Sequence, residues 1–214
     1  MHNELILPVP VLMIHRGRIT PAEQQHHIVL QIILKDLGYP EELVLSANSS
    51  EQAQSIISEH LPNLIFHPIQ EAEDLAFIQK IKTLYPASYL ITVHDNATKT
   101  DEILEAIQLG ADAYLLKDAP AEQQFQHVKC ILSGGALLHP QVAQHLQTQF
   151  KDGAASQQQP MFSHAESEII QYIGQSHTAT ETAEVIQVSE YQVFTLIKNI
   201  FRKLTRQHKQ KKGS

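Results

Sequence analysis

The feature that most constrains the fold is an alternation of short apolar runs with helical patterns over residues 1–135. The expected strands are residues 9–14, 43–45, 64–66, 89–93 and 113–116, and a helical pattern follows each of them. Five strands that alternate with helices predict a parallel sheet covered on both faces. Because crossovers between parallel strands are right-handed, the predicted fold class is α/β, with a doubly wound five-stranded sheet.

A second, smaller domain is predicted after a linker. Residues 140–150 have the pattern of an extra helix, and residues 151–161 are small, polar and interrupted by proline. Three short helical patterns follow, which is the size and order of a helix-turn-helix domain. We therefore expect an α/β domain over 1–136, an extra helix and linker over 137–161, and a small all-α domain with a basic tail over 162–214.

Local signals predict where several helices begin. Thr20 with Glu23, and Ser163 with Glu166, have the spacing of capping boxes, and Pro21 stands at a first helical position. Ser189 is a further expected N-cap.

The charge is unevenly distributed along an acidic chain whose formal net charge is −7. Residues 1–150 carry eight Lys/Arg and seventeen Asp/Glu, whereas residues 190–212 carry seven basic residues and one acid. Such asymmetry is typical of a polyanion-binding module attached to an acidic domain. For residues 209–212 alone we expect only a disordered tail that adds nonspecific affinity.

Several protein classes are excluded by what the sequence lacks. Cys130 is the single cysteine, so an internal disulfide framework and a thiolate zinc site are excluded. No apolar stretch is long enough to cross a bilayer, and residues 1–15 lack a basic n-region. We expect a soluble cytoplasmic protein without a membrane partner. Because no phosphate-binding glycine loop, nucleophile elbow or metalloprotease helix is present, we expect neither an enzyme nor a cofactor.

Two stretches resemble the receiver domain of bacterial response regulators. Residues 109–118 (LGADAYLLKD) resemble its fifth-strand signature, and residues 133–140 (SGGALLHP) resemble the end of the receiver in NarL/LuxR-type regulators. Residues 162–166 (FSHAE) stand where that family begins its DNA-binding domain, and residues 188–204 resemble its recognition helix. The resemblance implies a flavodoxin-like receiver fold followed by a LuxR-type helix-turn-helix. It also implies a dimeric transcriptional regulator of a two-component system that binds double-stranded DNA.

The sequence departs from this family at the phosphorylation site. Family members have a phosphoacceptor aspartate at the end of the third strand and an acidic pair at the end of the first, which together hold Mg²⁺. The matching positions are Pro68 for the aspartate and His15 and Arg16 for the acidic pair. Proline has no side-chain oxygen to phosphorylate, and a cation at Arg16 would repel Mg²⁺. We therefore expect an atypical receiver that does not use phosphate and serves dimerisation or the sensing of a ligand or partner.

Little of the family's remaining reactive set is retained. Lys117 matches its lysine, and the switch hydroxyl falls on Thr92 or Val93. A register slip that makes Asp74 or Glu71 the acceptor is the alternative, although neither directly follows the strand. The degenerate phosphorylation pocket is predicted to comprise His15, Arg16, Pro68, Thr92, Val93 and Lys117.

Three histidines, His15, His67 and His94, follow three of the expected strands. A transition-metal site is one hypothesis for them, since neutral imidazoles suit such ions. An anion site on Arg16 and Lys117 is another. With 13 histidines in the chain, we prefer chance proximity and predict no metal.

The last helical pattern contains the expected DNA contacts. By the resemblance, Phe194, Thr195 and Lys198 meet the major groove and Gln192 contacts a phosphate. Lys198 and Arg202 share one helical face, with Asn199 and Lys203 adjacent to them. The opposite, core-facing positions are Val193, Ile197, Ile200 and Leu204.

Two functions are consistent with the sequence. One is a phosphorylation-independent transcriptional regulator, a homodimer that binds an inverted repeat in double-stranded DNA through residues 162–208. The alternative is a protein-interaction adaptor that binds another regulator or a sensor protein without specific DNA binding.

Overall fold

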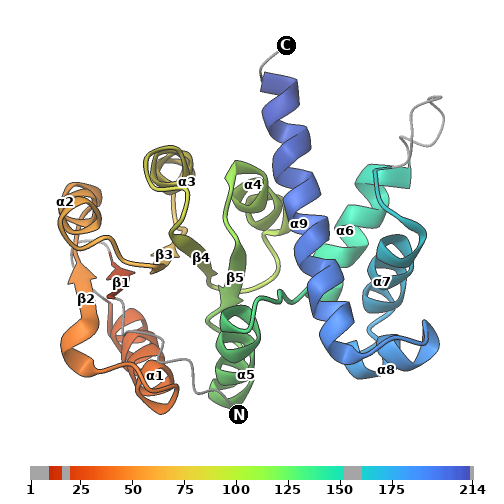
Figure 1. Cartoon of the computed structure of the whole chain (residues 1–214), viewed down its shortest axis with the longest axis horizontal. Helices are drawn as coiled ribbons and strands as arrows, with labels where there is room; N and C mark the ends of the chain where they lie inside the picture. The colour runs from red at the N-terminus through yellow and green to blue at the C-terminus, as the bar shows by residue number, and fades with distance from the viewer. Residues whose placement is uncertain (1–9, 16–19, 152–160, 213–214) are drawn as a thin grey trace, which may run out of the picture. The chain divides into compact units, whose positions relative to one another are not determined.

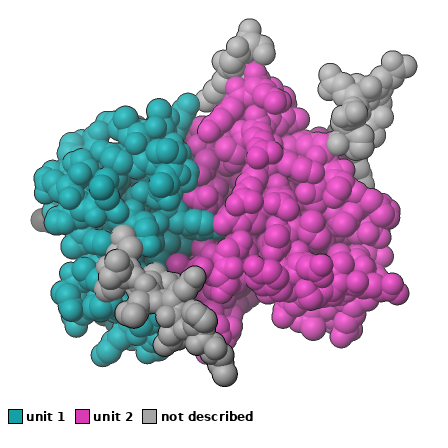
Figure 2. Space-filling model, viewed as in Figure 1, with its two compact units in different colours: residues 1–93 teal, residues 94–214 magenta. Residues whose placement is uncertain are grey.

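The computed structural model describes residues 10–15, 20–151 and 161–212 (Figure 1). The chain divides after Val93 into two compact units, residues 1–93 and residues 94–214, which we call the first and the second unit (Figure 2). The predicted linker falls almost entirely outside the described residues, as does Arg16. The domain boundaries proposed at 136 and 161 stay predictions. No helix in the described ranges combines the length and the apolarity needed to cross a membrane.

The first unit alternates strands and helices in the predicted order. Its elements are β1 (Val11–Ile14), α1 (Pro21–Asp36), the 3₁₀ helix η1 (Glu41–Leu43), β2 (Val44–Ala47), α2 (Ser50–His60), β3 (Leu64–Pro68), α3 (Ala72–Leu84) and most of β4 (Tyr89–His94). β1 pairs in parallel with both β2 and β3, and β3 pairs in parallel with β4. β1 is buried over its whole length and β3 and β4 over nearly all of theirs, as expected for central parallel strands covered on both faces.

The five strands form one sheet in the order β2-β1-β3-β4-β5. This order belongs to the flavodoxin-like doubly wound folds, whose ligand sites lie at the carboxyl ends of the strands. The predicted α/β fold class, with a helical C-terminal region, is confirmed.

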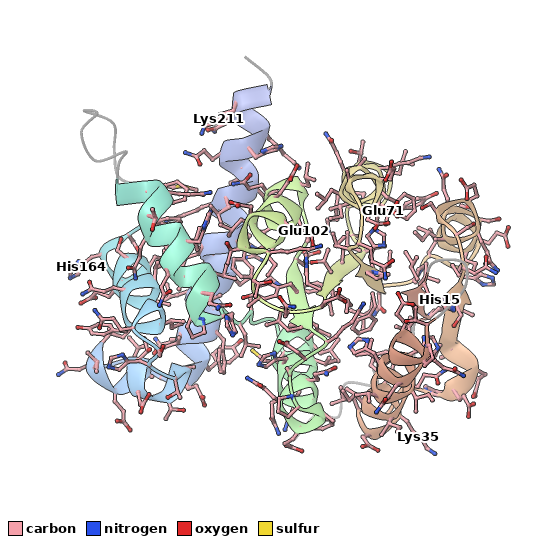
Figure 3. The ribbon with its side chains drawn as sticks, turned by 180° about the vertical axis from the view of Figure 1, so that it is seen from behind. His15, Lys35, Glu71, Glu102, His164 and Lys211 are labelled. Atoms are coloured by element: carbon pink, nitrogen blue, oxygen red, sulfur yellow. The ribbon has the colours of Figure 1, made fainter. Side chains whose placement is uncertain are left out.

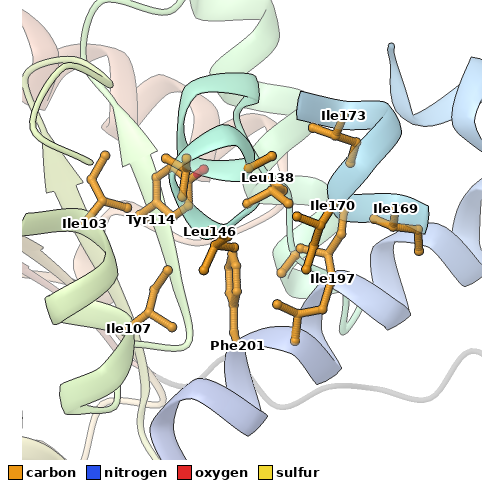
Figure 4. Close-up of a cluster of buried hydrophobic side chains, with 14 of the residues drawn as sticks. Ile103, Ile107, Tyr114, Leu138, Leu146, Ile169, Ile170, Ile173, Ile197 and Phe201 are labelled. Atoms are coloured by element: carbon orange, nitrogen blue, oxygen red, sulfur yellow. The ribbon is translucent and has the colours of Figure 1, made fainter. Parts of the chain in front are cut away.

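Over its described residues, the second unit contains β5 and six helices. They are α4 (Thr100–Leu109), β5 (Ala113–Leu116), α5 (Ala121–Leu132), α6 (Pro140–Lys151), α7 (His164–Gly174), α8 (Ala179–Val185) and α9 (Glu190–Lys212). One continuous apolar cluster joins α4 and β5 to α6, α7 and α9 (Figure 4). The three last helices therefore share a core with α4 and β5; Thr205 of α9, for example, contacts Ile107 of α4 98 positions earlier.

Side-chain caps fix the starts of these helices. Glu23 N–H donates to Thr20 Oγ1 over 3.3 Å, and the Glu23 carboxylate accepts from Thr20 N over 2.8 Å. The same reciprocal pair joins Ser163 and Glu166. Both predicted capping boxes are thus confirmed. A third, at Thr178 and Glu181 before α8, has the same spacing in the sequence but was not among the predictions.

His94 is a buried polar group in the second unit. Its side chain is 1% exposed, its Nδ1 lies 3.2 Å from Glu102 Oε1, and its ring meets Tyr114 edge-on. Burial lowers the pKa of His94 to about 4, although Glu102 acts in the opposite direction. The ring is therefore neutral at pH 7, so its contact with Glu102 is a hydrogen bond donated by Nδ1–H.

The His94→Asn variant should resist mild acid better than the wild type. The unfolded histidine takes up its proton near pH 6.5 and the folded one near pH 4. The contribution of neutral His94 to the free energy of unfolding is therefore fully present above pH 6.5 and is lost as the pH falls towards 4. An asparagine amide keeps a donor for Glu102 without titrating. Urea unfolding measures the free energy of unfolding at pH 7 and at pH 4.5. Between these pH values the variant should lose about 2 kcal/mol less of it than the wild type. Equal losses in the two proteins would contradict a buried, neutral His94.

Candidate nucleic-acid interface

α9 begins at a side-chain cap that fixes the orientation of its first turn. Ser189 is the cap, because Gln192 N–H donates to Ser189 Oγ over 3.2 Å. The amide oxygen of Gln192 in turn accepts from Ser189 N over 2.9 Å. Gln192 is exposed, but its side-chain oxygen is already engaged in this capping.

The predicted core face of α9 is buried as expected. Val193, Ile197, Ile200 and Leu204 are each at most 1% exposed. This face packs on α7 and α8. The three-and-four spacing of apolar residues in the sequence correctly predicted this contact.

A second face of α9 packs against α4. Phe201 is 2% exposed, and its ring centroid lies 6.1 Å from that of Tyr114 in β5 (Figure 4). Thr205 Oγ1 donates to the backbone carbonyl of Ile107 in α4 over 2.7 Å. Lys198 is only 8% exposed. In this arrangement Lys198 therefore presents little of its surface to a DNA phosphate.

The start of α9 contacts the turn between α5 and α6. Ala136 N–H donates to the carbonyl of Phe194 over 3.2 Å. A Cβ added to Gly135 would lie 2.8 Å from both Cys130 Sγ and Phe194 Cβ. Only glycine therefore permits this close approach, and Phe194 is half-buried against the turn.

The remaining predicted DNA contacts of α9 lie in different surroundings. Thr195 and Asn199 are partly exposed and Arg202 is exposed. Lys203 Nζ lies 2.5 Å from Glu166 Oε2, and the Glu166 side chain is 4% exposed. The charge of Lys203 is thus engaged within the helical bundle.

The later turns of α9 form a row of exposed basic side chains. The expectation of a disordered tail over 209–212 is wrong: the helix continues to Lys212, well past the predicted end at 204. Arg202, Arg206 and Lys209 are exposed and follow one another at four- and three-residue spacing. Lys211 lies near the end of the same helix (Figure 3). We call Arg202, Arg206 and Lys209 the basic row.

The predicted acceptor position, Pro68, lies at the end of β3. β3 ends at Pro68, which pairs in register with Val93 of β4, and Ile69 N–H donates to the Val93 carbonyl. Asp74, the alternative acceptor, is 1% exposed and lies in the first turn of α3. Its carboxylate accepts from the backbone N–H groups of Gln70 and Glu71. Asp74 therefore serves as a structural cap.

His15, His27 and His67 contact other groups of the first unit. His15 Nδ1 lies 2.7 Å from the carbonyl of Ala47, and the His15 ring stacks on His27 with centroids 5.2 Å apart. Burial lowers the pKa of both rings. His67 is 1% exposed, and its Nε2 lies 3.0 Å from the carbonyl of Asp74.

The remaining predicted pocket residues are also engaged or covered. Thr92 is fully buried and Val93 is 3% exposed. In the second unit, Lys117 Nζ lies 2.8 Å from Asp95 Oδ1. Within the described residues, no group of three or more His, Cys, Asp or Glu side chains could hold a metal ion. The structure thus gives no support to a metal site on His15, His67 and His94.

The relatives of this chain are transcriptional regulators. DegU of Brevibacillus brevis is 21% identical over 183 residues, which cover 76% of each chain. The nitrate/nitrite response regulator NarP of Escherichia coli (strain K12) is 27% identical over 115 residues, 54% of this chain and 52% of NarP. No family model matches.

A solved structure supports the fold over nearly the whole chain. The RcsB response regulator of Salmonella typhimurium superposes with a TM-score of 0.53 at 14% identity, over 92% of this chain and 93% of RcsB. The homologues of this chain are therefore NarL/LuxR-type response regulators, the family that its sequence resembles.

Proposed function

We propose that this protein is a DNA-binding transcriptional regulator whose receiver-like domain acts without phosphorylation. The observation that carries the DNA-binding proposal is the basic row at the end of α9. Arg202, Arg206 and Lys209 project from one exposed side of the last helix in a capped three-helix unit. Guanidinium and ammonium groups at this spacing match the phosphates of a duplex.

The proposal of phosphate independence rests on the end of β3. A receiver of this family transfers a phosphoryl group to a carboxylate at that position, where this chain has Pro68. The neighbouring carboxylate of Asp74 is occupied by two backbone N–H donors. We therefore propose that a ligand, a protein partner or homodimerisation, rather than phosphorylation, supplies the input.

Reading of base edges requires α9 to leave its present contacts. Phe194 lies against the Gly135 turn and Lys198 is covered. We call the arrangement in which Phe194 contacts the Gly135 turn and Lys198 is covered the closed form. In this form, the exposed cations of α9 lie on its later turns. We propose that the closed form binds DNA weakly through the basic row, and that an open form adds Phe194, Thr195 and Lys198 in the major groove of an inverted repeat.

A protein-interaction adaptor is the second candidate function, because the covered Lys198 favours it. An adaptor would keep the closed arrangement and bind a regulator or sensor protein instead. Mobility-shift assays at low salt on genomic and random DNA separate the two functions. A shift supports the regulator, whereas no shift on any DNA together with stable capture of one purified partner supports the adaptor.

Neutralising the basic row should weaken DNA binding. We predict that Arg202→Gln with Arg206→Gln lowers affinity at least about tenfold at low salt, since two phosphate contacts are lost. The slope of log affinity against log salt should become shallower by about two. The control is Lys99→Gln, which replaces an exposed lysine at the N-cap of α4 (60% exposed). Unchanged affinity and slope in the double variant would contradict the assignment.

Treatment with acetyl phosphate and Mg²⁺ should leave the protein unmodified. We predict no phosphoryl adduct by intact mass spectrometry and no change in DNA affinity, because Pro68 offers no acceptor oxygen. A regulator that carries the aspartate serves as the positive control. An adduct on Asp74 or Glu71 that changes DNA affinity would overturn phosphate independence.

Crowding the Gly135 turn should favour the open form. In Gly135→Ala the new Cβ meets Phe194 and Cys130 at 2.8 Å, so α9 must move away. We predict DNA affinity about three- to tenfold higher, because the competent form is more populated. Gly134→Ala is the matched control: its φ of +87° makes alanine strained, but nothing lies within 4 Å of the added Cβ. An equal effect of both substitutions would show that general loosening, not α9, is responsible.

A further inference from the structure

A cavity lies between α5 and the first turns of α8 and α9. Its volume is about 500 Å³, and its walls include Gln123, His127 and Cys130 from α5, Thr178 before α8, and Tyr191 from α9. Small-molecule sites in proteins usually occupy about 300–1,000 Å³. All of these residues belong to the second unit. We call this space the α5–α9 cavity.

The walls of the α5–α9 cavity are largely apolar and carry no excess charge. Tyr191 and Phe194 provide aromatic rings, and Gln123 and Gln126 provide neutral amides. Lys129 and Glu190, of opposite sign, are the charged residues in the lining.

Two side chains on the α5 wall, His127 and Cys130, are neutral at pH 7. Burial, and then His139, lower the pKa of His127. Burial, and then Glu190, raise the pKa of Cys130 to about 11, although Lys198 acts in the opposite direction. Lys129 and Glu190 are both exposed, so the more covered part of the wall around His127 and Cys130 offers an ion no charged partner. That part suits an uncharged molecule with an aromatic ring.

Tyr191 is an exposed aromatic residue beside the α5–α9 cavity. It is 62% exposed although it is a large aromatic residue at the start of α9. It therefore adds little to the folded core, whereas the core residues of the same helix are almost fully buried. An exposed aromatic ring at the edge of a largely apolar hollow is typical of a ligand site.

We propose that the α5–α9 cavity binds an uncharged aromatic small molecule, whose occupancy holds α9 in the closed arrangement. One wall belongs to α5 and the other moves with α9, so a molecule that contacts both stabilises the closed form. The effector would therefore reduce DNA binding. The regulatory part of this inference rests on the proposed function, whereas the binding site itself does not.

Cys130 makes the site directly testable by disulfide exchange. It lines the cavity and is the single cysteine of the chain. The full-length protein is equilibrated with symmetric disulfides RSSR whose R carries a phenyl, an alkyl, a carboxylate or an ammonium group, over a range of reductant concentrations. The Cys130 thiolate attacks one sulfur, the mixed disulfide forms and RSH leaves. Intact mass then measures how much of each is retained. We expect the phenyl adduct to survive about tenfold more reductant than the charged ones, equivalent to about 1.4 kcal/mol.

Two matched variants show whether the cavity causes this preference. The first moves the thiol along α5 with Cys130→Ala and Glu122→Cys, an exposed position outside the cavity lining; it should show no phenyl preference. The second, Tyr191→Ser, should reduce the preference at Cys130, whereas Val185→Ser, also an exposed apolar residue but outside the lining, should not. Equal retention of all four groups at Cys130, or an equal preference at position 122, would overturn the site.

DNA-binding measurements distinguish the claim that the cavity binds a ligand from the claim that this ligand controls DNA binding. The phenyl adduct should bind DNA more weakly than the unmodified protein, and DNA should reduce phenyl retention by the same factor, as linkage requires. A phenyl preference without any DNA binding would support the site and reject the proposed function. A phenyl preference with unchanged DNA affinity would reject the claim that occupancy holds α9 closed.

Discussion

The packing of α9 on α4 and β5 is the contact on which the second unit depends. Phe201 lies against Tyr114, and Thr205 bonds the carbonyl of Ile107, so a helix from the C-terminal end completes the core around the last strand (Figure 4). Exposing a side chain such as Phe201 costs about 1.5–3 kcal/mol. If DNA reading requires α9 to detach, that cost lowers the apparent affinity by about ten- to a hundredfold. A modest contact is therefore large enough to regulate binding.

The charges of α9 are divided between two roles by the same packing. Lys198 is covered and Lys203 is engaged with buried Glu166, while Arg202 and Arg206 face solvent. A cation that is paired in a partly buried site stabilises the bundle, whereas exposed cations remain available to a polyanion. Counting basic residues in the sequence overestimates the phosphate contacts for this reason.

The histidine-rich character of the chain has mainly a structural basis in the described residues. His67 and His94 are each 1% exposed and hydrogen-bonded, and His15 stacks on His27. Buried imidazoles are neutral and polar, so each needs a local partner. For the same reason, the buried carboxylate of Asp74 accepts hydrogen bonds from two backbone N–H groups just before α3. These side chains form hydrogen bonds or ring contacts at strand ends and at the first turn of α3.

Sequence alone determined the alternating strands and helices, both predicted capping boxes and the core face of α9, because periodicity and capping depend on residues a few positions apart. It also placed Pro68 at the end of the third strand, where β3 ends in the structure. Only the tertiary structure decided that Phe201 and Lys198 are covered, that Gly135 must lack a side chain, and that a cavity lies beside Tyr191. Those features depend on contacts between segments that are distant in the sequence. A local pattern does not encode which polar face of a helix will be covered by another element.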